Sequence, residues 1–257
     1  MLRNKYLHFS FLTLIFLFAS SGSYNLNSQT LNQKGNVRIG IEGGLQITGI
    51  NDPYMQVSKD GNGYNFGPYI EYYLSEFVKL RGSVQFDNRK FSLENGIQYI
   101  VDDSGYIGRS SYYYLKEAFS VNYLTIPVSV IFERGTGKLK FFLQGSIYYS
   151  LLLNSDQTGE RYVYISEEDA EEFFFEGHPE FNNPGIHVLD PITRKFNSSD
   201  IGLNIMLGLS YSVTPKIDLN ISPGFTFAFS NVWEDPARTA KWSRVYKFTA
   251  GLSYKLK

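Results

Sequence analysis

The chain has 257 residues and a formal net charge of −1, with 24 basic and 25 acidic side chains. This balance gives no indication of a nucleic-acid partner. The chain contains no cysteine, which excludes disulfides, a lipid-modified N-terminal cysteine and cysteine-ligated metals.

The N-terminus has the three-part layout of a secretory signal peptide. Arg3 and Lys5 form a short basic region, an apolar run follows at 9–19, and small residues come next. The run is shorter than the about 20 apolar residues of a membrane-spanning helix. We therefore expect a signal peptide at 1–23, with cleavage as late as residue 28 as an alternative, and a short linker at 24–37. An uncleaved N-terminal anchor is the other interpretation.

From residue 38 onward the hydrophobic pattern has a period of two, which is typical of strands with one apolar and one polar face. In the first segment Ile39 and Ile41 alternate with Arg38 and Glu42. Eight such segments are predicted, at 38–49, 63–74, 78–91, 119–132, 138–153, 200–213, 216–229 and 242–257. Most run about 12 residues or more, whereas strands of soluble proteins usually have about 5–6.

The fourth segment needs an irregularity if its polar residues are to share one face. Leu124, Ile126 and Val128 form an apolar row. Placing Ser120 and Asn122 on the opposite face, together with Thr125, requires a one-residue slip near Tyr123. We therefore expect such a slip in this strand.

The connections between the segments alternate between short and long. Short connections are expected at 75–77, 133–137 and 214–215, and long ones at 50–62, 92–118, 154–199 and 230–241. An outer-membrane barrel has short periplasmic turns and long external loops, whereas a soluble sandwich does not sort its loops in this way. The prediction is an all-β fold, an eight-stranded antiparallel up-and-down transmembrane β-barrel with long external loops, over 38–257.

Aromatic residues make up 17% of the chain, while the mean hydropathy is only −0.22. Such a mixture is expected when aromatic side chains face lipid in alternating strands. Aromatics near strand ends are expected to form two interfacial girdles, with Tyr64, Tyr149, Phe229 and Trp242 on the outer side and Tyr211 and Tyr254 on the periplasmic side.

The polar face of the predicted strands carries charges that would lie inside the barrel. The residues assigned to the lumen are Arg38, Glu42, Glu71, Lys79, Arg81, Asp87, Arg89, Lys140, Asp218 and Lys247. An eight-stranded barrel is just wide enough for side chains, and an unpaired buried charge is costly. We expect these groups to form ion pairs that fill the interior; a proton or ion path is the alternative.

The connection at 154–199 combines acidic and aromatic residues. Glu171 and Glu172 directly precede Phe173, Phe174 and Phe175. The acids predict a solvated surface segment, although clustered carboxylates also suit Ca²⁺. The triple phenylalanine is a candidate contact for a partner, because exposed apolar patches often mark interaction sites.

No recognised catalytic pattern is present in the sequence. His8 lies within the expected signal peptide, and His178 and His187 lie in the acidic connection, without a G-x-S-x-G or H-E-x-x-H motif. We therefore expect no catalytic residue, no metal ligand and no cofactor. The alternative is an envelope-modifying enzyme that uses one of these two histidines.

Five stretches of the sequence are informative together: IGIEGG at 39–44, YLTIPV at 123–128, FLQGSIYY at 142–149, DIGLNIMLG at 200–208 and GLSYKLK at 251–257. In these stretches the chain resembles the PorT-like outer-membrane β-barrel family of Bacteroidota. The resemblance implies a Gram-negative source and the cell outer membrane as location. One member type of the family is an accessory factor of a secretion system. Many outer-membrane barrels end in an aromatic residue, whereas this chain ends in Leu256–Lys257.

The leading functional hypothesis is a non-enzymatic outer-membrane barrel with a structural, surface-interaction or secretion-accessory role. Its expected partners are outer-membrane lipid, the barrel-insertion machinery and secretion-system or envelope proteins. The two alternatives are the envelope-modifying enzyme and a soluble lipocalin-like barrel that binds an apolar ligand.

Overall fold

The computed structural model describes residues 34–51, 57–101, 107–165, 185–189, 194–234 and 241–256. The predicted signal peptide and most of the linker lie outside these ranges. The strands are β1 (Val37–Asn51), β2 (Val57–Tyr73), β3 (Val78–Ser83), β4 (Gln85–Val101), β5 (Ile107–Thr136), β6 (Leu139–Ile165), β7 (Gly185–Leu189), β8 (Ser199–Ser212), β9 (Ile217–Ala228) and β10 (Lys241–Lys255). Within this part of the chain, no helix has the length and apolar character needed to cross a membrane.

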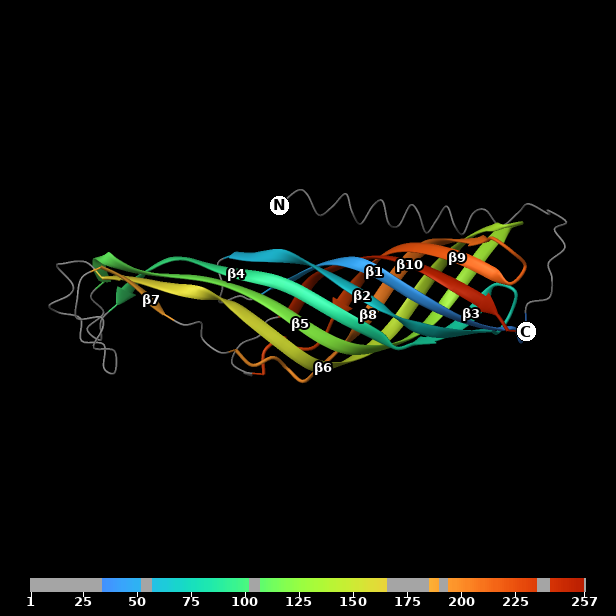
Figure 1. Ribbon diagram of the computed structural model, residues 1–257, viewed down its shortest axis with the longest axis horizontal. Helices are drawn as coiled ribbons and strands as arrows, with labels where there is room; N and C mark the ends of the chain where they lie inside the picture. The colour runs from blue at the N-terminus through green and yellow to red at the C-terminus, as the bar shows by residue number, and fades with distance from the viewer. Residues whose placement is uncertain are drawn as a thin grey trace. The chain divides into compact units, whose positions relative to one another are not determined.

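The strands form one antiparallel sheet that closes on itself, because β1 pairs with β2 on one side and with β10 on the other (Figure 1). Going around the ring from β2 to β10, the strands follow in the order β3 with β4, β5, β6, β8 and β9. Since β3 and β4 are consecutive parts of one strand, the ring has eight strands, which confirms the predicted fold.

The hydrogen-bond registers show how far the strands are staggered around the ring. The chain of partners that starts at Arg38 runs through Glu71, Arg81, Ser129, Ser146, Asn204, Thr226 and Val245 and returns to β1 at Thr48. The path therefore arrives ten residues from its start (48 − 38). A stagger of this size requires strands that are strongly tilted from the barrel axis, as in closed membrane barrels.

The break between β3 and β4 has a local cause in the neighbouring strand. Pro68 of β2 lies opposite the break and has no N–H group to donate to the ladder. The pairing of β2 with β3 ends at Tyr69, and its pairing with β4 resumes at Phe66. At the break itself the N–H of Val84 donates to the carbonyl oxygen of Pro68 at 3.2 Å.

Apolar side chains cover the outside of the barrel and polar ones fill the inside. In β1, Ile41 and Leu45 are 58% and 72% exposed, whereas the alternate residues Glu42 and Gln46 are buried. The same division holds for the outward rows of the other barrel strands, including Ile70, Val84, Val128, Ile147, Leu203, Leu219 and Phe248. A soluble barrel would bury these side chains instead, so the outer surface is a lipid-facing belt.

The aromatics expected near the belt edges lie on the outward face. Tyr64, Tyr149, Phe229, Tyr211 and Tyr254 are each between 41% and 54% exposed. At the edge near Tyr64, the rings of Tyr64, Phe66 and Phe86 form one cluster with centroids 5.6–6.5 Å apart. The side chain of Trp242 lies outside the described part of the structure.

We call the two ends of the barrel the turn end and the loop end. The turn end has the three short connections, at 74–77, 137–138 and 213–216, together with the start of β1 and the end of β10. Gly137 adopts φ +66°, a left-handed conformation that favours glycine in a tight turn. The short turns confirm the predicted alternation of connections.

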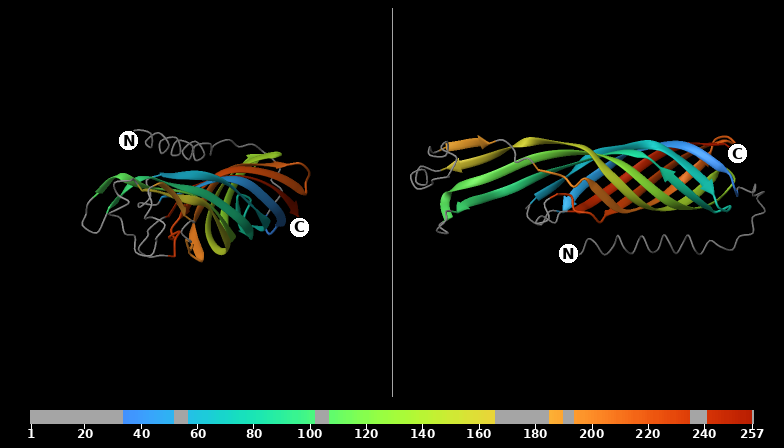
Figure 2. Two further views of the ribbon diagram at one scale, coloured as in Figure 1. Left: turned by 60° about the vertical axis from the view of Figure 1, so that its left-hand side comes forward. Right: turned by 90° about the horizontal axis from the view of Figure 1, so that it is seen from below.

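At the loop end, the long connections expected at 92–118 and 154–199 were predicted wrongly in part. The strands β4, β5 and β6 continue through much of both stretches and project beyond the ring, where β7 pairs with β6 (Figure 2). We call this projection of β4, β5 and β6, together with β7, the extension. It is a continuous hydrogen-bonded sheet. Its strands are stabilised by pairing with each other and not by burial in lipid.

In the extension the inward face carries apolar side chains and the outward face carries polar ones, which is the reverse of the barrel. In β5 the inward row stays on the odd-numbered residues throughout, but it changes from Thr125 and Ser129 in the barrel to Phe119 and Val121 in the extension. Ser120 and Asn122 therefore face outward, and the predicted slip near Tyr123 is wrong. The register irregularity at this level lies in β6, which places one extra residue, Leu153, opposite β5.

Candidate functional site in the barrel interior

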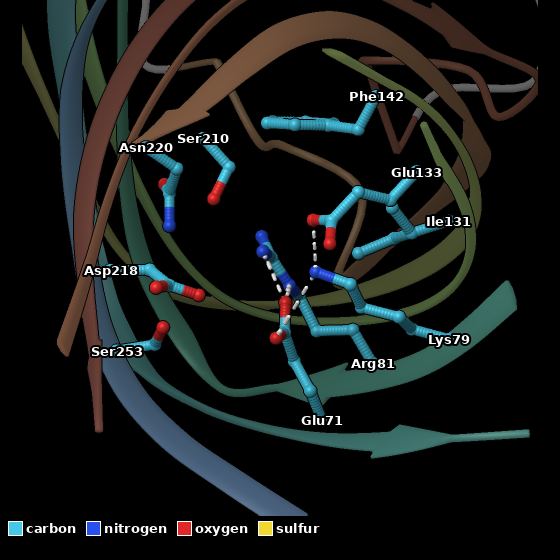
Figure 3. A pocket seen from close by; sticks show the side chains of 10 residues that line it. All are labelled: Glu71, Lys79, Arg81, Ile131, Glu133, Phe142, Ser210, Asp218, Asn220 and Ser253. Carbon is cyan, nitrogen blue, oxygen red and sulfur yellow. Dashed lines mark hydrogen bonds and ion pairs between the residues drawn. The ribbon is translucent and has the colours of Figure 1, made fainter. Parts of the chain in front are cut away.

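Near the turn end, one arginine holds two glutamates together inside the barrel. Figure 3 shows this arginine, Arg81, beside one of them, Glu71. Arg81 of β3 donates from Nε and Nη2 to Oε1 of Glu71 at 2.9 and 2.6 Å, and from Nη1 to Oε2 of Glu42 at 2.8 Å. Its guanidinium lies 4.2 Å from the ring centroid of Tyr69. All four side chains are buried. Hydrogen bonds between a charged donor and a charged acceptor are stronger than those between neutral groups.

A second group of ion pairs completes this layer. Lys79 pairs with Glu133, which also accepts from Lys140 at 2.9 Å, and the Lys79 ammonium lies 3.8 Å from Glu71. On the other side of the lumen Arg38 pairs with Asp218. The cavity that remains between these side chains has a volume of about 10 Å³, which is about the space of one water molecule.

A middle layer lies closer to the loop end. Arg89, which has no exposed surface, contacts Oδ2 of Asp87 at 3.0 Å and Oδ2 of Asp200 at 2.7 Å. The Lys247 ammonium lies 3.5 Å from Asp87, and the hydroxyl of Tyr148 donates to Asp200 at 2.9 Å. These contacts join strands β4, β6, β8 and β10 across the lumen.

Above the middle layer, an aromatic cluster covers the loop end of the lumen. Phe91 of β4 and Phe119 of β5 stack with centroids 4.8 Å apart. Phe196 and Trp233 come from the segments that flank β8 and β9, form an isolated bridge with each other, and contact both phenylalanines. All four are at most 6% exposed. We call these four residues the aromatic cap.

One further ion pair adjoins the aromatic cap. Arg194 Nε donates to Oε2 of Glu117 at 3.0 Å, and its guanidinium lies 5.6 Å from the Trp233 ring centroid. Glu117 has no exposed surface. This pair connects the extension to the segment that precedes β8.

The buried charges of the described interior balance. The cations are Arg38, Lys79, Arg81, Arg89 and Lys247 with the less buried Lys140 and Arg194, and the anions are Glu42, Glu71, Asp87, Glu117, Glu133, Asp200 and Asp218. Seven positive and seven negative groups therefore cancel. Such pairing offsets the cost of removing each charge from water, so the arrangement is that of a filled core.

The residues assigned to the lumen from sequence lie in this network. Arg38, Glu42, Glu71 and Arg81 are buried, and Lys140 is partly buried at the turn end with 15% of its side chain exposed. Arg81 brings Glu42 and Glu71 together. Arg38 pairs with Asp218, which was also assigned to the lumen, whereas Lys140 pairs with Glu133, which was not.

Sequence reasoning did not find Glu117, Glu133 and Arg194. Glu133 follows the apolar row of β5 and was placed in a turn, although its odd number puts it on the inward face. Glu117 and Arg194 were placed in long loops. The alternation of inward and outward residues continues on the N-terminal side of residue 119. Following it to residue 117 would have placed Glu117 on the inward face.

The candidate partner-contact residues Glu171, Glu172, Phe173, Phe174 and Phe175 lie outside the described residues, as do His178 and the side chain of His187. Among the residues that are described, no group of three or more histidine or acidic side chains has a metal-binding arrangement. The hypotheses of Ca²⁺ binding and of partner contact in the acidic connection stay predictions.

A closed ring of tilted strands with an apolar outer belt and a filled polar interior defines an outer-membrane β-barrel protein. Residues 27–234 match the family described as outer membrane protein beta-barrel domain. The chain belongs to this family and is located in the outer membrane. This location excludes the soluble lipocalin-like alternative.

The chain is similar to several solved structures. The attachment invasion locus protein Ail of Yersinia pestis is 12% identical over 87% of this chain and 99% of its own, with a TM-score of 0.38. Neisserial surface protein A is 15% identical over 84% and 96%, with a TM-score of 0.40. OprG of Pseudomonas aeruginosa is 11% identical over 88% and 98%, with a TM-score of 0.45. A search of curated proteins gives no match.

Proposed function

We propose that the protein is a non-enzymatic outer-membrane barrel that holds its extension outside the membrane for contact with another component of the cell envelope. The observation that carries this proposal is the filled interior. Two ionic layers and the aromatic cap occupy the described lumen, while the extension continues beyond the lipid belt with a polar outer face. The barrel then acts as an anchor, and recognition falls to the extramembrane part.

The surface of the extension supports the contact role. Its outward residues include Lys116, Asp156, Thr158 and Glu160, all of which are exposed. On the inward side Phe119 and Val121 are buried, and Glu117 pairs with Arg194, so this part of the extension packs against the protein. An exposed polar face on a packed sheet is suited to specific contact.

The closed interior is tested by electrical recording. The purified protein, inserted into planar bilayers, should give no steady conductance, because an ion path would require breaking buried pairs at a cost of about 3–5 kcal/mol each. A porin in the same bilayers provides the positive control. Stable, voltage-independent conductance of single inserted molecules would contradict the proposal.

The contact role is tested by photocrosslinking in intact cells. A photoreactive residue at Lys116 or Asp156, on the extension, should capture an envelope protein, whereas the same residue at Val128 in the lipid belt should capture lipid. The PorT-like resemblance makes a secretion-system component the first partner to test. Identical products from the extension and the belt would argue against a dedicated contact surface.

The non-enzymatic assignment is tested separately. In the interior that the structure describes, the acidic groups are paired with basic ones, so none is placed as a free acid or base next to a bound substrate. Cells that carry His178→Ala and His187→Ala should retain wild-type envelope composition and wild-type crosslinking. A change in lipid or protein processing caused by either variant would favour the enzyme alternative.

A further inference from the structure

We propose that the turn end of the barrel binds the phosphate groups of anionic phospholipids through a collar of basic side chains. The collar consists of Arg134, Lys138, Lys216 and Lys255. The first three are exposed and Lys255 is half-buried. No ion pair joins any of the four to an acid among the described residues.

The collar residues come from strands β5 and β10 and from two turns, but they lie at the same end of the barrel. The N–H of Lys255 donates to the carbonyl oxygen of Lys216 at 2.8 Å, so the end of β10 adjoins the turn between β8 and β9. The N–H of Ser212 donates to the carbonyl oxygen of Lys138 at 2.8 Å, which places the turn between β5 and β6 beside the end of β8. The part of the ring from β5 through β6, β8 and β9 to β10 therefore carries these four cations at one rim.

The collar adjoins the edge of the lipid belt. Arg134 continues the outward row of β5 after Phe132 and pairs in register with Phe141 of β6. Both phenylalanines are about half exposed, as are Tyr211 and Tyr254 at the same end. Aromatic side chains of this kind occupy the membrane–water interface. The cations next to them are thus at the depth of the phospholipid headgroups, which selects lipid phosphate as the ligand.

The charge at the two ends of the barrel differs. In the described turns the acid near the collar is Glu76 alone, and Lys34 adds a further cation. At the loop end the exposed charges are mixed, with Lys59, Lys90, Lys116 and Lys195 against Asp60, Asp156, Glu160 and Glu234. Attraction of an anionic surface to the barrel is therefore expected at the turn end, where basic residues act together.

Short turns face the periplasm in outer-membrane barrels, so the ligand is the phospholipid of the periplasmic leaflet. The collar would then fix the depth of the barrel in the membrane and enrich anionic lipid around this end. The energy involved is electrostatic and is weakened by salt, because the groups are exposed to solvent.

The test measures lipid selectivity of the full chain reconstituted in phosphatidylcholine bilayers. Spin-labelled phosphatidylglycerol and spin-labelled phosphatidylcholine report how strongly each lipid associates with the barrel. The wild-type protein should favour phosphatidylglycerol several-fold, with each basic residue contributing about fivefold or less. The preference should fall as NaCl is raised from low concentration to 1 M.

The collar variant carries Arg134→Gln, Lys138→Gln and Lys216→Gln. Its preference for phosphatidylglycerol should fall to about one. The matched control, Lys90→Gln, Lys116→Gln and Lys195→Gln at the loop end, removes the same charge and should keep the wild-type preference. A shift of the unheated band in electrophoresis verifies that each variant has folded as a barrel.

Two results would overturn the proposal. The first is equal loss of selectivity in the collar variant and the loop-end control, which would mean that net charge alone is responsible. The second is a wild-type preference of about one together with collar-dependent sedimentation on purified peptidoglycan, which would identify a cell-wall polyanion as the ligand instead.

Discussion

The buried position of Arg81 between two glutamates makes it the most informative single substitution. In Arg81→Met the side chain keeps much of its length but loses its charge, so Glu42 and Glu71 lose the donors that lie 2.6–2.9 Å away. Lys79 remains 3.8 Å from Glu71 but is already paired with Glu133. We expect a loss of about 3–5 kcal/mol in the free energy of unfolding, the usual cost of an orphaned buried charge.

The assay is equilibrium unfolding in urea, followed by the fluorescence of the two tryptophans, with the barrel folded in zwitterionic lipid vesicles. Arg134→Met is the matched control, since the same chemical change at an exposed position should alter stability by about 0.5 kcal/mol or less. The double variant Arg81→Met/Glu71→Gln should recover part of the loss, because it restores the charge balance of the layer.

Equal stability of Arg81→Met and Arg134→Met would refute this reasoning. Such a result would mean that water reaches Glu42 and Glu71 freely and solvates them when the arginine is removed. The interior would then be hydrated, and the argument for a closed barrel would fail at the same time.

Three further predictions concern the cap, the sheet and the belt. Phe119→Ala, which removes a buried ring of the aromatic cap, should cost about 3–5 kcal/mol and expose the extension to proteolysis, while unheated electrophoresis still shows a folded barrel. Gly67→Ala should destabilise the barrel by about 1–3 kcal/mol in urea unfolding, because a Cβ at this position would lie 2.0 Å from the carbonyl oxygen of Val84. The control is Gly145→Ala, which should be neutral because a Cβ there meets nothing within 4 Å. Nitroxide labels at Ile126→Cys and Asp156→Cys, the chain's only thiols, should report oxygen-rich lipid and water respectively; water contact at Ile126 would contradict the lipid belt.

The strand number and the orientation of the barrel strands followed from local sequence. Ile41 and Leu45 alternate with Glu42 and Gln46, and because side chains alternate between the faces of a strand, this pattern alone separates a lipid face from an interior. The short turns likewise mark where strands must reverse. Closure into a ring was predictable for the same reason, since lipid does not satisfy an exposed sheet edge.

The prediction failed where the environment of the strands changes. The rule that polar residues face inward holds only within the membrane. Beyond it, water lies outside the sheet and the apolar residues turn toward the protein, so Phe119 and Val121 are buried while Ser120 and Asn122 face outward. Applying the membrane rule to this part of β5 produced the incorrect slip near Tyr123.

The amino-acid sequence by itself determined that this chain forms an eight-stranded barrel and, in the membrane part of the strands, which alternate row of side chains enters its interior, because both depend on a repeat of two residues. Only the tertiary structure decided which charges meet. Arg38 and Asp218 are 180 positions apart, and Arg89 and Asp200 are 111 apart. Their pairing depends on the ten-residue stagger of the closed ring. This stagger sets the position of each strand along the barrel axis relative to strands that are far away in the chain. No local sequence pattern specifies it.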